Sequence, residues 1–498
     1  MRRPAGLLVG VLVLALLSTV DGSAAPGPRV APAPAPAPAA LARPAPEPEP
    51  ARAPVSQSPA PTPSAAAVSP AYDLLAAPPV ADCPQGTVCA DPIRFGARPD
   101  DGADDSAAFE AAVKAGGTVL VPAGTYLFSR PLRLRAGQTL AGAGMARTTL
   151  LLSWAHLANF SFDYVVSPES ATATDVTVRD LTVDGGRRRS ACADGAYTGS
   201  CVHNRGGGIS VGTRWTVTRT RFTGLNYFKL WICAAQDVRI LDNRWDNRAP
   251  GTGSGGEDNV GGGCATNGIT LSGNRFDATL VGNVIDIARA SGVRVDGNVS
   301  LTGSVFLEGV TDATFTRGSI TGGGLNVLSN AGYESAAEYG NHNPSGVSVT
   351  DNRIDGAVWG INLRYSDRPG VSNRPGGGNV IARNTVTGAA RVAILVTACQ
   401  PGARTRPDTV TDNVVVDAGT DAADTYNSGC ALLEPVGIAV AAGSGDTVTG
   451  NAVTDTRTPA LTRYGISVGA RYAPPTDRTV LRDNRVTGVP GGVEYHPR

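Results

Sequence analysis

The chain has 498 residues, and its 43 lysines plus arginines balance its 43 aspartates plus glutamates, so the formal net charge is zero. A chain without net charge has no overall field that attracts nucleic acid or anionic lipid, and we expect neither as a partner. The 62 glycines and the aromatic content of 5% argue against helical bundles and favour an all-β protein.

The N-terminus has the order of features of a secretory signal peptide. Two arginines, Arg2 and Arg3, precede an apolar run over residues 7–20, and small residues follow up to Ala25. We therefore assign residues 1–25 to a signal peptide that is removed on export.

Residues 26–80 are rich in alternating alanine and proline. This composition favours an extended, disordered linker, because it cannot bury a core. No later apolar run reaches the length of a membrane span. We therefore expect a secreted, extracellular protein that is not inserted in a membrane, with a linker that can hold it near the cell wall.

All eight cysteines lie in residues 81–498, which we assign to one folded domain. An even number of cysteines in an exported chain indicates disulfides, whereas zinc is disfavoured because no Cys-x-x-Cys occurs and there are only four histidines. Sequence order leaves the pairing open. Disulfides between cysteines that are consecutive in the sequence would close local loops, and they give the pairs Cys83–Cys89, Cys192–Cys201, Cys233–Cys264 and Cys399–Cys430.

The first element of this domain is predicted to be a short amphipathic helix. Asp105 or Ser106 is its candidate cap, and it ends near Gly116. A strand follows and opens a stack of strands. Because the first coil of such a stack has an open apolar end, we expect the helix to cover it.

One pattern then recurs through the chain: a strand of the form Gly-Ile-x-Val, a turn, and a second strand of the form Val-x-Ile-x-x-Asn-x-Val/Phe. The second half occurs at residues 238–245, 269–276 and 347–354, and its asparagine returns at Asn298, Asn384, Asn413, Asn451 and Asn484. Such short strands cannot bury their apolar face alone, so they stack about 4.8 Å apart around a continuous core.

This repeat predicts a parallel β-helix with about ten or eleven coils between residues 165 and 486. The recurring asparagine is expected to occupy a tight turn in each coil and to stack as a ladder.

The strings FGARPDDGADDSAAFEAAV (95–113) and GGTVLVPAGTY (116–126) resemble the N-terminal signature of the pectate-lyase-like superfamily. That superfamily includes polygalacturonases, rhamnogalacturonases, β-glucanases, lyases, epimerases and phage tailspike enzymes. The resemblance implies a single-stranded, right-handed parallel β-helix. It leaves the reaction open, because one fold serves many functions.

In each Gly-Ile-x-Val strand the isoleucine and valine point into the core, so the residues between and after them point outward. In the middle coils the outward positions hold polar and aromatic residues, as expected of a glycan-binding groove: Ser210, Lys229, Trp231, Asp286, Phe306, Glu308, Asn326, Asn362 and Arg364. In the coils nearer the C-terminus, the outward positions hold Leu395, Ala439 and Ser467.

Asp286 and Glu308 are one coil and two residues apart, which predicts a Cα separation of roughly 8 Å. Facing carboxylates about 6.5 to 9.5 Å apart suit an inverting glycosidase, with one as general acid and one activating water. Asp286 also resembles the aspartate in the Gly-Ile-Asp strand of polygalacturonases, whose paired aspartates, Gly-His-Gly and Arg-Ile-Lys are not evident here. We expect a polysaccharide-cleaving glycoside hydrolase. The alternative for these residues is a solvated carboxylate paired with Arg364.

A second hypothesis is a polysaccharide lyase or epimerase that acts on uronates. It needs a base that removes the proton α to the carboxyl and a cation that neutralises the carboxyl. Lys229 can serve as the base, and Arg364, or a calcium ion held by Asp286 or Glu308, as the cation. A third hypothesis is a non-catalytic glycan-binding protein. Apart from calcium in a lyase, we expect no cofactor and no metal.

Further candidates for binding the polysaccharide lie around this row. They are the aromatic residues Trp231, Phe306 and Tyr365, the amides Asn326 and Asn362, the loop histidines His203 and His342, and Asp258. Asp258 belongs to a glycine-rich insertion over residues 251–264, which is expected to overhang the groove beside Lys229 as a loop.

Overall fold

The computed structural model describes residues 86–153, 163–186, 206–225, 227–246, 258–277, 283–300, 303–330, 340–366, 373–398, 403–419, 435–441, 445–469 and 478–495, together with Cys83 and four residues near 430. They belong to a compact unit that spans residues 72–498. The predicted signal peptide (1–25) and linker (26–80) lie outside the described residues and stay predictions.

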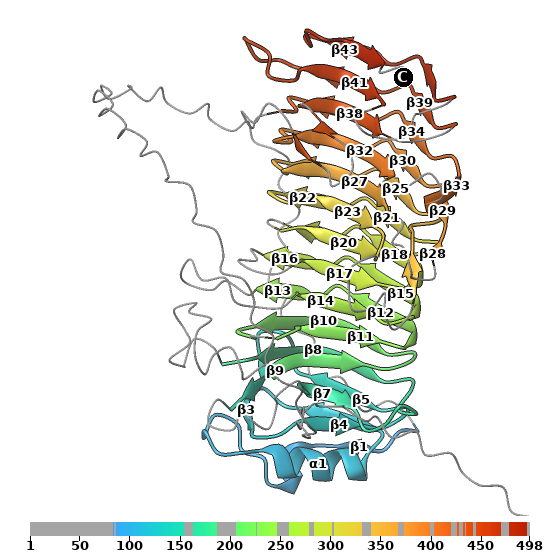
Figure 1. Ribbon diagram of the computed structural model, residues 1–498. Coiled ribbons are helices and arrows are strands. Elements are labelled where there is room, and N and C mark those ends of the chain that lie inside the picture. Colours follow the sequence, from blue (N-terminus) through green and yellow to red (C-terminus); the bar gives the residue numbers. More distant parts are fainter. Residues whose placement is uncertain are drawn as a thin grey trace, which may run out of the picture. The chain divides into compact units, whose positions relative to one another are not determined.

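The described strands stack as the coils of a parallel β-helix (Figure 1). One sheet has a single strand per coil and thirteen strands within the described residues: β4 (Leu132–Leu134), β7 (Asp163–Pro168), β9 (Gly206–Val211), β11 (Leu230–Cys233), β14 (Val260–Gly263), β17 (Ile285–Ala288), β20 (Val305–Glu308), β23 (Leu325–Leu328), β27 (Trp359–Tyr365), β32 (Val392–Ala398), β38 (Val436–Ala441), β41 (Tyr464–Val468) and β44 (Val493–Tyr495). Eleven of these, β7 to β41, lie where the repeat predicts ten or eleven coils. The predicted all-β parallel β-helix is thus confirmed.

The larger sheet forms the rest of each coil. Its strands are β1 (Cys89–Ala90), β2 (Thr118–Val121), β3 (Gly124–Phe128), β5 (Thr139–Gly142), β6 (Thr148–Leu152), β8 (Thr177–Asp184), β10 (Thr216–Thr223), β12 (Gln236–Leu241), β13 (Arg244–Asp246), β15 (Asn267–Ser272), β16 (Arg275–Asp277), β18 (Ser291–Asp296), β19 (Val299–Ser300), β21 (Thr314–Thr316), β22 (Ser319–Thr321), β25 (Ser348–Thr350), β26 (Arg353–Asp355), β30 (Val380–Ala382), β31 (Thr385–Thr387), β34 (Thr409–Thr411), β35 (Val414–Val416), β39 (Thr447–Thr449), β40 (Ala452–Thr454), β42 (Val480–Arg482) and β43 (Arg485–Thr487). Three short pairs lie apart from both sheets: β24 (Asn341–His342) with β28 (Asn373–Arg374), β29 (Gly376–Gly377) with β33 (Arg404–Arg406), and the antiparallel β36 (Tyr426–Asn427) with β37 (Leu432–Leu433).

The turn between the two short strands of a coil explains the recurring asparagine. A residue in the left-handed conformation comes first, as Arg383 does with φ 55° before Asn384. The asparagine Oδ1 then accepts hydrogen bonds from the backbone N and the Nδ2 of the asparagine one coil earlier, at 3.0 and 2.9 Å for Asn352 and Asn384. Its own Nδ2 donates to a strand carbonyl.

Two such ladders run through the described coils. They consist of Asn243, Asn274 and Asn298, and of Asn352, Asn384, Asn413, Asn451 and Asn484. Gly318, which has no side chain, occupies the position between them and donates its N–H to Asn352. The predicted ladder is confirmed, with this one interruption.

Helix α1 (Ser106–Ala115), which follows the short 3₁₀ helix η1 (Pro92–Phe95), lies at the N-terminal end of the stack (Figure 1). Phe109 packs edge-on against Tyr126 and Phe128 of the first coil, with ring centroids 5.1 and 4.9 Å apart. The predicted capping helix is confirmed. The side chain that accepts from its first turn is that of Asp104, which takes the Ser106 N–H at 3.1 Å, rather than that of Asp105.

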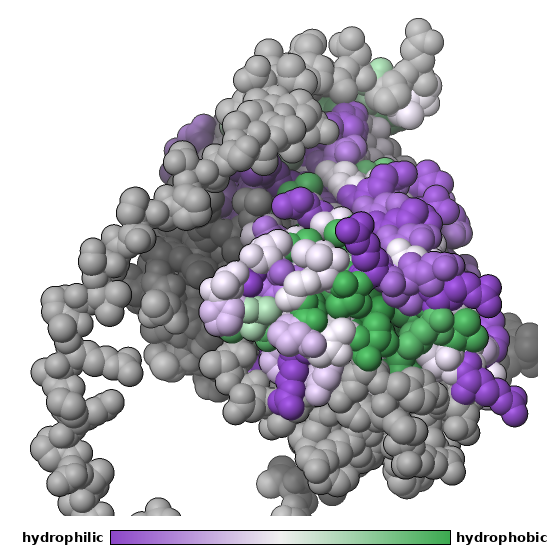
Figure 2. Space-filling view, turned by 90° about the horizontal axis from the view of Figure 1, so that it is seen from above, coloured by the Kyte–Doolittle hydropathy of each residue, from purple (hydrophilic) through white to green (hydrophobic). Residues whose placement is uncertain are grey.

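The opposite end of the stack has an apolar surface. In the view from the C-terminal end, hydrophobic residues gather between hydrophilic ones (Figure 2). Val480 and Val493 are exposed there, and Leu481 and Val486 are only partly buried against the core.

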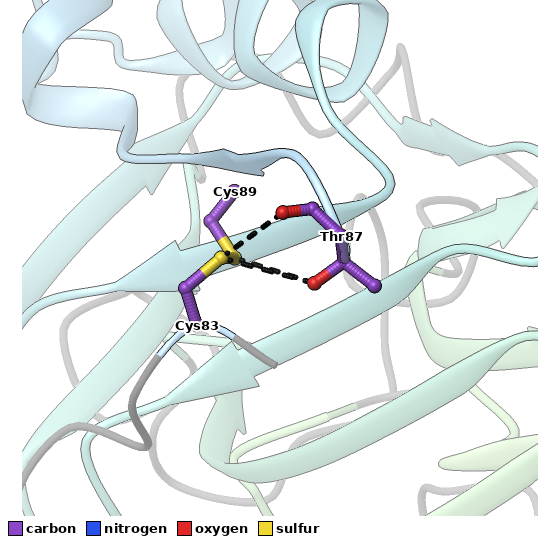
Figure 3. The surroundings of a disulfide bond; sticks show 3 residues. All are labelled: Cys83, Thr87 and Cys89. Atoms are coloured by element: carbon purple, nitrogen blue, oxygen red, sulfur yellow. Dashed lines mark hydrogen bonds between the residues drawn. A yellow bond between two sulfur atoms is a disulfide. The ribbon is translucent and has the colours of Figure 1, made fainter. Parts of the chain in front are cut away.

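Two predicted disulfides are confirmed, Cys83–Cys89 and Cys233–Cys264. Thr87 lies beside the first one (Figure 3), with its Oγ1 3.9 Å from the Cys89 Sγ. The second connects the end of β11 to the residue that follows β14, one coil later. The predicted pairs Cys192–Cys201 and Cys399–Cys430 lie outside the described residues.

Candidate functional site

One row of residues crosses the thirteen-stranded sheet in register, on the side away from the core. We call it the outer row: Ser210, Trp231, Gly261, Asp286, Phe306, Asn326, Asn362, Leu395, Ala439 and Ser467. The predicted alignment of these residues is confirmed for all of them except Gly261, which was not predicted. Lys229, Glu308 and Arg364 lie at other register positions.

The coil of Gly261 was not predicted as a strand. The expectation of a loop over residues 251–264 is wrong for its last part, because Val260–Gly263 forms β14. Three consecutive glycines give no alternating pattern from which a strand could be predicted. They fit here because the chains approach closely: a Cβ on Gly262 would lie 1.9 Å from the Ile232 carbonyl oxygen. This coil separates Trp231 from Asp286.

Asp286 is the half-buried carboxylate at the centre of the outer row. Its Oδ2 accepts a hydrogen bond of 2.9 Å from the Nδ2 of Asn283. Burial raises the pKa of Asp286 to about 6, against the opposite effect of the Asn283 hydrogen bond. A carboxyl with this pKa is partly protonated near neutral pH and can act as a general acid.

Asp258, half-buried just before β14, is connected to Asp286 through hydrogen bonds to one shared residue, Asn283. Its Oδ1 accepts the backbone N–H of Asn283 at 2.5 Å, so one residue contacts both acids. With the covalent dimensions of a single asparagine between them, the two accepting oxygens lie no more than roughly 10 Å apart. Sequence reasoning missed Asn283, since nothing in the pattern around it marks a contact to either acid.

Glu308 does lie one coil and two residues from Asp286, as predicted, because Ala288 pairs with Glu308. Its expected position on an open surface is wrong, since only 2% of it is exposed. The segment that contains His342 packs beside the next residue: a Cβ on Gly309 would lie 3.0 Å from the His342 carbonyl oxygen. Asn330 and His342 therefore lie close to the residue that follows β20.

Lys229 also differs from the expectation. It is 0% exposed, so its predicted place on the groove surface is wrong. Strand β11 begins at Leu230, and Lys229 therefore precedes the alternation from which its position was inferred. Arg364 is half-buried and lies three coils from Asp286, roughly 14 Å along the stack.

Aromatic rings form a contiguous cluster on the N-terminal side of Asp286. Phe228 contacts Trp231 with ring centroids 4.5 Å apart and Tyr227 with centroids 4.8 Å apart, and Tyr227 approaches Tyr164 at 5.8 Å. Trp231, Phe228 and Tyr227 are half-buried. We call these three the aromatic cluster. Of these, sequence reasoning identified only Trp231, although the aromatic density of residues 227–231 was a visible signal.

Phe306 follows Asp286 directly in the outer row and is half-buried, so its predicted contact with sugar stays a prediction. Tyr365 is different: its predicted contact with sugar is wrong because the ring is fully buried. Its hydroxyl donates to the Asp408 Oδ2 at 2.6 Å, and Arg404 bridges Asp408 and Asp446. Tyr365 thus belongs to a buried ionic network.

His342, expected as a loop histidine that binds the polysaccharide, is 4% exposed and lies in strand β24. Its Nδ1 lies 2.5 Å from the Nη1 of Arg289, and its strand β24 pairs with that of Arg374. Burial, and then the charges of these two arginines, lower the pKa of His342 to about 4, so the ring is neutral at neutral pH. His203 lies outside the described residues.

Towards the C-terminus the residues of the outer row become buried. Asn362 donates from Nδ2 to the Asn326 Oδ1 at 3.2 Å. Leu395 and Ala439, next in the row, are buried in an apolar cluster with Val392 and others, against which Trp359 and Tyr464 also pack. Asn326 is itself only 9% exposed, so its expected place on an open surface is wrong. The half-buried members of the row are Ser210, Trp231, Asp286, Phe306 and Asn362.

Further features of the described residues lie away from the outer row. An open cavity of about 380 Å³ lies on the larger sheet, lined by Arg214, Asp237 and Arg239, and Arg214 there is bonded to Asp175 at 2.6 Å. Among the described residues no group of three or more His, Cys, Asp or Glu side chains is placed to hold a metal ion. Neither described helix has the length and apolar composition that crossing a bilayer requires.

Comparison with known proteins places this fold. Residues 93–184 match the family described as "Rhamnogalacturonase A/epimerase, pectate lyase-like". The catalytic unit of the thermostable GH87 alpha-1,3-glucanase from Streptomyces thermodiastaticus strain HF3-3 is 16% identical, with a TM-score of 0.50 over 84% of this chain and 71% of that chain. The predicted resemblance to the pectate-lyase-like β-helix superfamily is confirmed.

Two more distant structures are similar over 82% of this chain. They are the A-module of the Azotobacter vinelandii mannuronan C-5 epimerase AlgE4 (18% identity, TM-score 0.37, 97% of that chain) and PfbA, a surface adhesin of Streptococcus pneumoniae (12% identity, TM-score 0.46, 93% of that chain). No curated protein sequence matches the chain.

Proposed function

We propose that this chain is an exported glycoside hydrolase that cleaves a polysaccharide lying along the outer row, with Asp286 as general acid. The observation that carries the proposal is the raised pKa of Asp286, about 6, at the centre of a row with aromatic groups on either side. A protonated carboxyl at that position can donate its proton to the glycosidic oxygen as the bond breaks.

Asp258 is our candidate for the second carboxylate, in place of Glu308. The upper bound on its distance from Asp286 is compatible with the separation of about 6.5 to 9.5 Å in inverting glycosidases. In this mechanism a water attacks the anomeric carbon and gives one proton to Asp258, while Asp286 protonates the leaving oxygen. The net reaction adds one water across the bond. The burial of Glu308 argues against direct contact with substrate.

The predicted signal peptide and linker support export to a compartment where polysaccharides occur. A uronate lyase or epimerase is the second candidate, because the matched family's description names an epimerase. It is less well supported, since Lys229, its proposed base, is fully buried.

The test is incubation of the mature protein with neutral polysaccharides, including α-1,3-glucan, and with acidic ones, with and without calcium. Reducing ends and ultraviolet absorbance are read together. We expect reducing ends without absorbance, and at least a 100-fold lower kcat in Asp286→Asn and Asp258→Asn. Glu308→Gln is the matched control and is expected to keep its activity.

Three results would contradict parts of this proposal. Absorbance from an unsaturated sugar would favour the lyase. Loss of activity in Glu308→Gln with full activity in Asp258→Asn would restore Glu308 as the second acid. If neither reducing ends nor absorbance appear with any polysaccharide of the panel, a non-catalytic glycan-binding protein would be favoured.

A further inference from the structure

We infer that the aromatic cluster, Tyr227, Phe228 and Trp231, forms a stacking subsite for an uncharged sugar ring on the N-terminal side of Asp286. The inference deepens the proposed function, on which it rests for the direction of the glycan along the outer row. It assigns a substrate class: a neutral glycan that extends past the cleaved bond towards the N-terminal coils.

The sheet beneath the cluster is shaped to hold the rings. A Cβ on Gly261 would lie 2.4 and 2.5 Å from Cδ1 and Cε1 of Phe228, so the glycine makes the space that one edge of this ring occupies. Gly207, two coils earlier, does the same for Tyr164, which approaches Tyr227. Two glycines in the thirteen-stranded sheet thus let aromatic rings lie directly on its outer side.

The rings keep a surface available to a ligand. Tyr227, Phe228 and Trp231 are each half-buried, whereas the interior aromatic residues Trp215, Trp245 and Phe276 are fully buried. Aromatic faces bind the apolar face of a sugar ring while the hydroxyl groups remain hydrogen-bonded elsewhere. The cluster therefore matches a pyranose better than it matches a strongly hydrated, charged group.

Charge favours a neutral ring at this position. Asp286 follows Trp231 by two coils, roughly 10 Å, and Asp258 lies between them, so two half-buried carboxylates border the subsite. A uronate placed here would bring its negative charge close to Asp258, and close to a second negative charge whenever Asp286 is ionised, which is unfavourable. The nearest lysine, Lys229, is fully buried and does not face the ligand.

The test measures binding without turnover. In the Asp286→Asn background, isothermal titration calorimetry with neutral gluco-oligosaccharides of increasing length is compared with galacturonan oligomers of equal length. We expect binding of the neutral series, and about tenfold weaker binding in both Phe228→Ala and Phe228→Leu, because leucine keeps apolar volume but has no ring face. Galacturonan oligomers should bind at least tenfold more weakly.

Gly261→Ala supplies a second, independent variant, because its added methyl group displaces the Phe228 ring without removing any aromatic residue. It should weaken binding as much as Phe228→Ala does. Gly117→Ala is the matched control, since the nearest atom to its Cβ is 4.0 Å away, and thermal unfolding confirms that each variant is folded.

Unchanged affinity in Phe228→Ala and Gly261→Ala, tighter binding of galacturonan, or no binding of any neutral oligomer would overturn the subsite. Neutral oligomers that bind through the cluster but are never cleaved by the wild-type protein would support the subsite and overturn the hydrolase instead.

Discussion

At the scale of single residues, the sequence predicts on which side of the sheet a strand residue lies, but it does not predict how far that residue is exposed to solvent. Alternation placed Asp286, Phe306 and Asn362 correctly on the outer side. It could not show that Glu308, on the same side, is only 2% exposed. Exposure depends on what packs over the strand, and that comes from residues far away in sequence.

Asp286 should lower the stability of the protein at neutral pH. Its pKa is about 6 in the folded state, against 3.8 for an ordinary aspartate, so the unfolded chain loses this proton first as the pH rises. The free energy of unfolding therefore falls between about pH 4 and pH 6 and stays lower above that window. Asp286→Asn removes this effect and should gain about 1–3 kcal/mol at pH 7.5 and little at pH 3.5.

Urea unfolding of wild type and Asp286→Asn at the two pH values measures this difference. Asp483→Asn, at an exposed turn, is the control for the substitution itself. An equal gain at both pH values would contradict the assigned burial of the ionised carboxylate.

The same pKa predicts the pH dependence of activity. Because a general acid must be protonated, kcat should fall as the pH rises through about 6. A pH–rate profile of the wild-type protein on its best substrate checks this, and a kcat that still rises between pH 6 and 8 would exclude Asp286 as the acid.

At the scale of elements, the asparagine ladder was predictable because it recurs in sequence at one position of each coil. Strand β14 was not, because Val260 is followed by three glycines that carry no hydrophobic pattern. Contacts between Gly262 or Gly263 and the neighbouring coils explain those glycines, and they exist only in the stack.

Removing one step of the ladder should destabilise the fold. Asn384→Ala deletes the acceptor of the Asn352 N–H and the donor to the Val349 carbonyl, both buried. Leaving these groups unpaired should cost about 2–4 kcal/mol in the free energy of unfolding, measured by urea titration. The end residue Asn484, which is only partly buried, is the matched control and should cost about 1 kcal/mol or less as Asn484→Ala. Equal losses at the two positions would contradict a cooperative ladder.

The capping helix should be required for a monomeric protein. Phe109→Ala removes the ring that α1 places on Tyr126 and Phe128, at a cost of about 3–5 kcal/mol. Exposure of the first coil should then promote association, because an open coil end pairs with other chains. Urea unfolding and light scattering read both effects. Phe95→Ala, 40% exposed, should change neither.

At the scale of the whole molecule, secretion and oxidation are the remaining predictions from sequence. The exported protein should begin near residue 26, and all eight cysteines should be in disulfides, because an even set of cysteines in an exported domain pairs. Intact mass spectrometry and a thiol assay in denaturant measure both. A mature chain that retains residues 1–25, or one that reacts as free thiols, would contradict export through an oxidising compartment.

The amino-acid sequence by itself determined the β-helix, ten or eleven of its thirteen described coils, the ladder, the helical cap and the alignment of Trp231, Asp286, Phe306 and Asn362. These follow from local patterns that repeat once per coil, so each copy reinforces the inference. Only the tertiary structure decided which members of that row reach solvent, that Lys229 and Tyr365 are buried, and that Asn283 contacts both Asp258 and Asp286. Burial and hydrogen bonding of this kind arise between coils, where residues distant in sequence meet, and no local pattern records them.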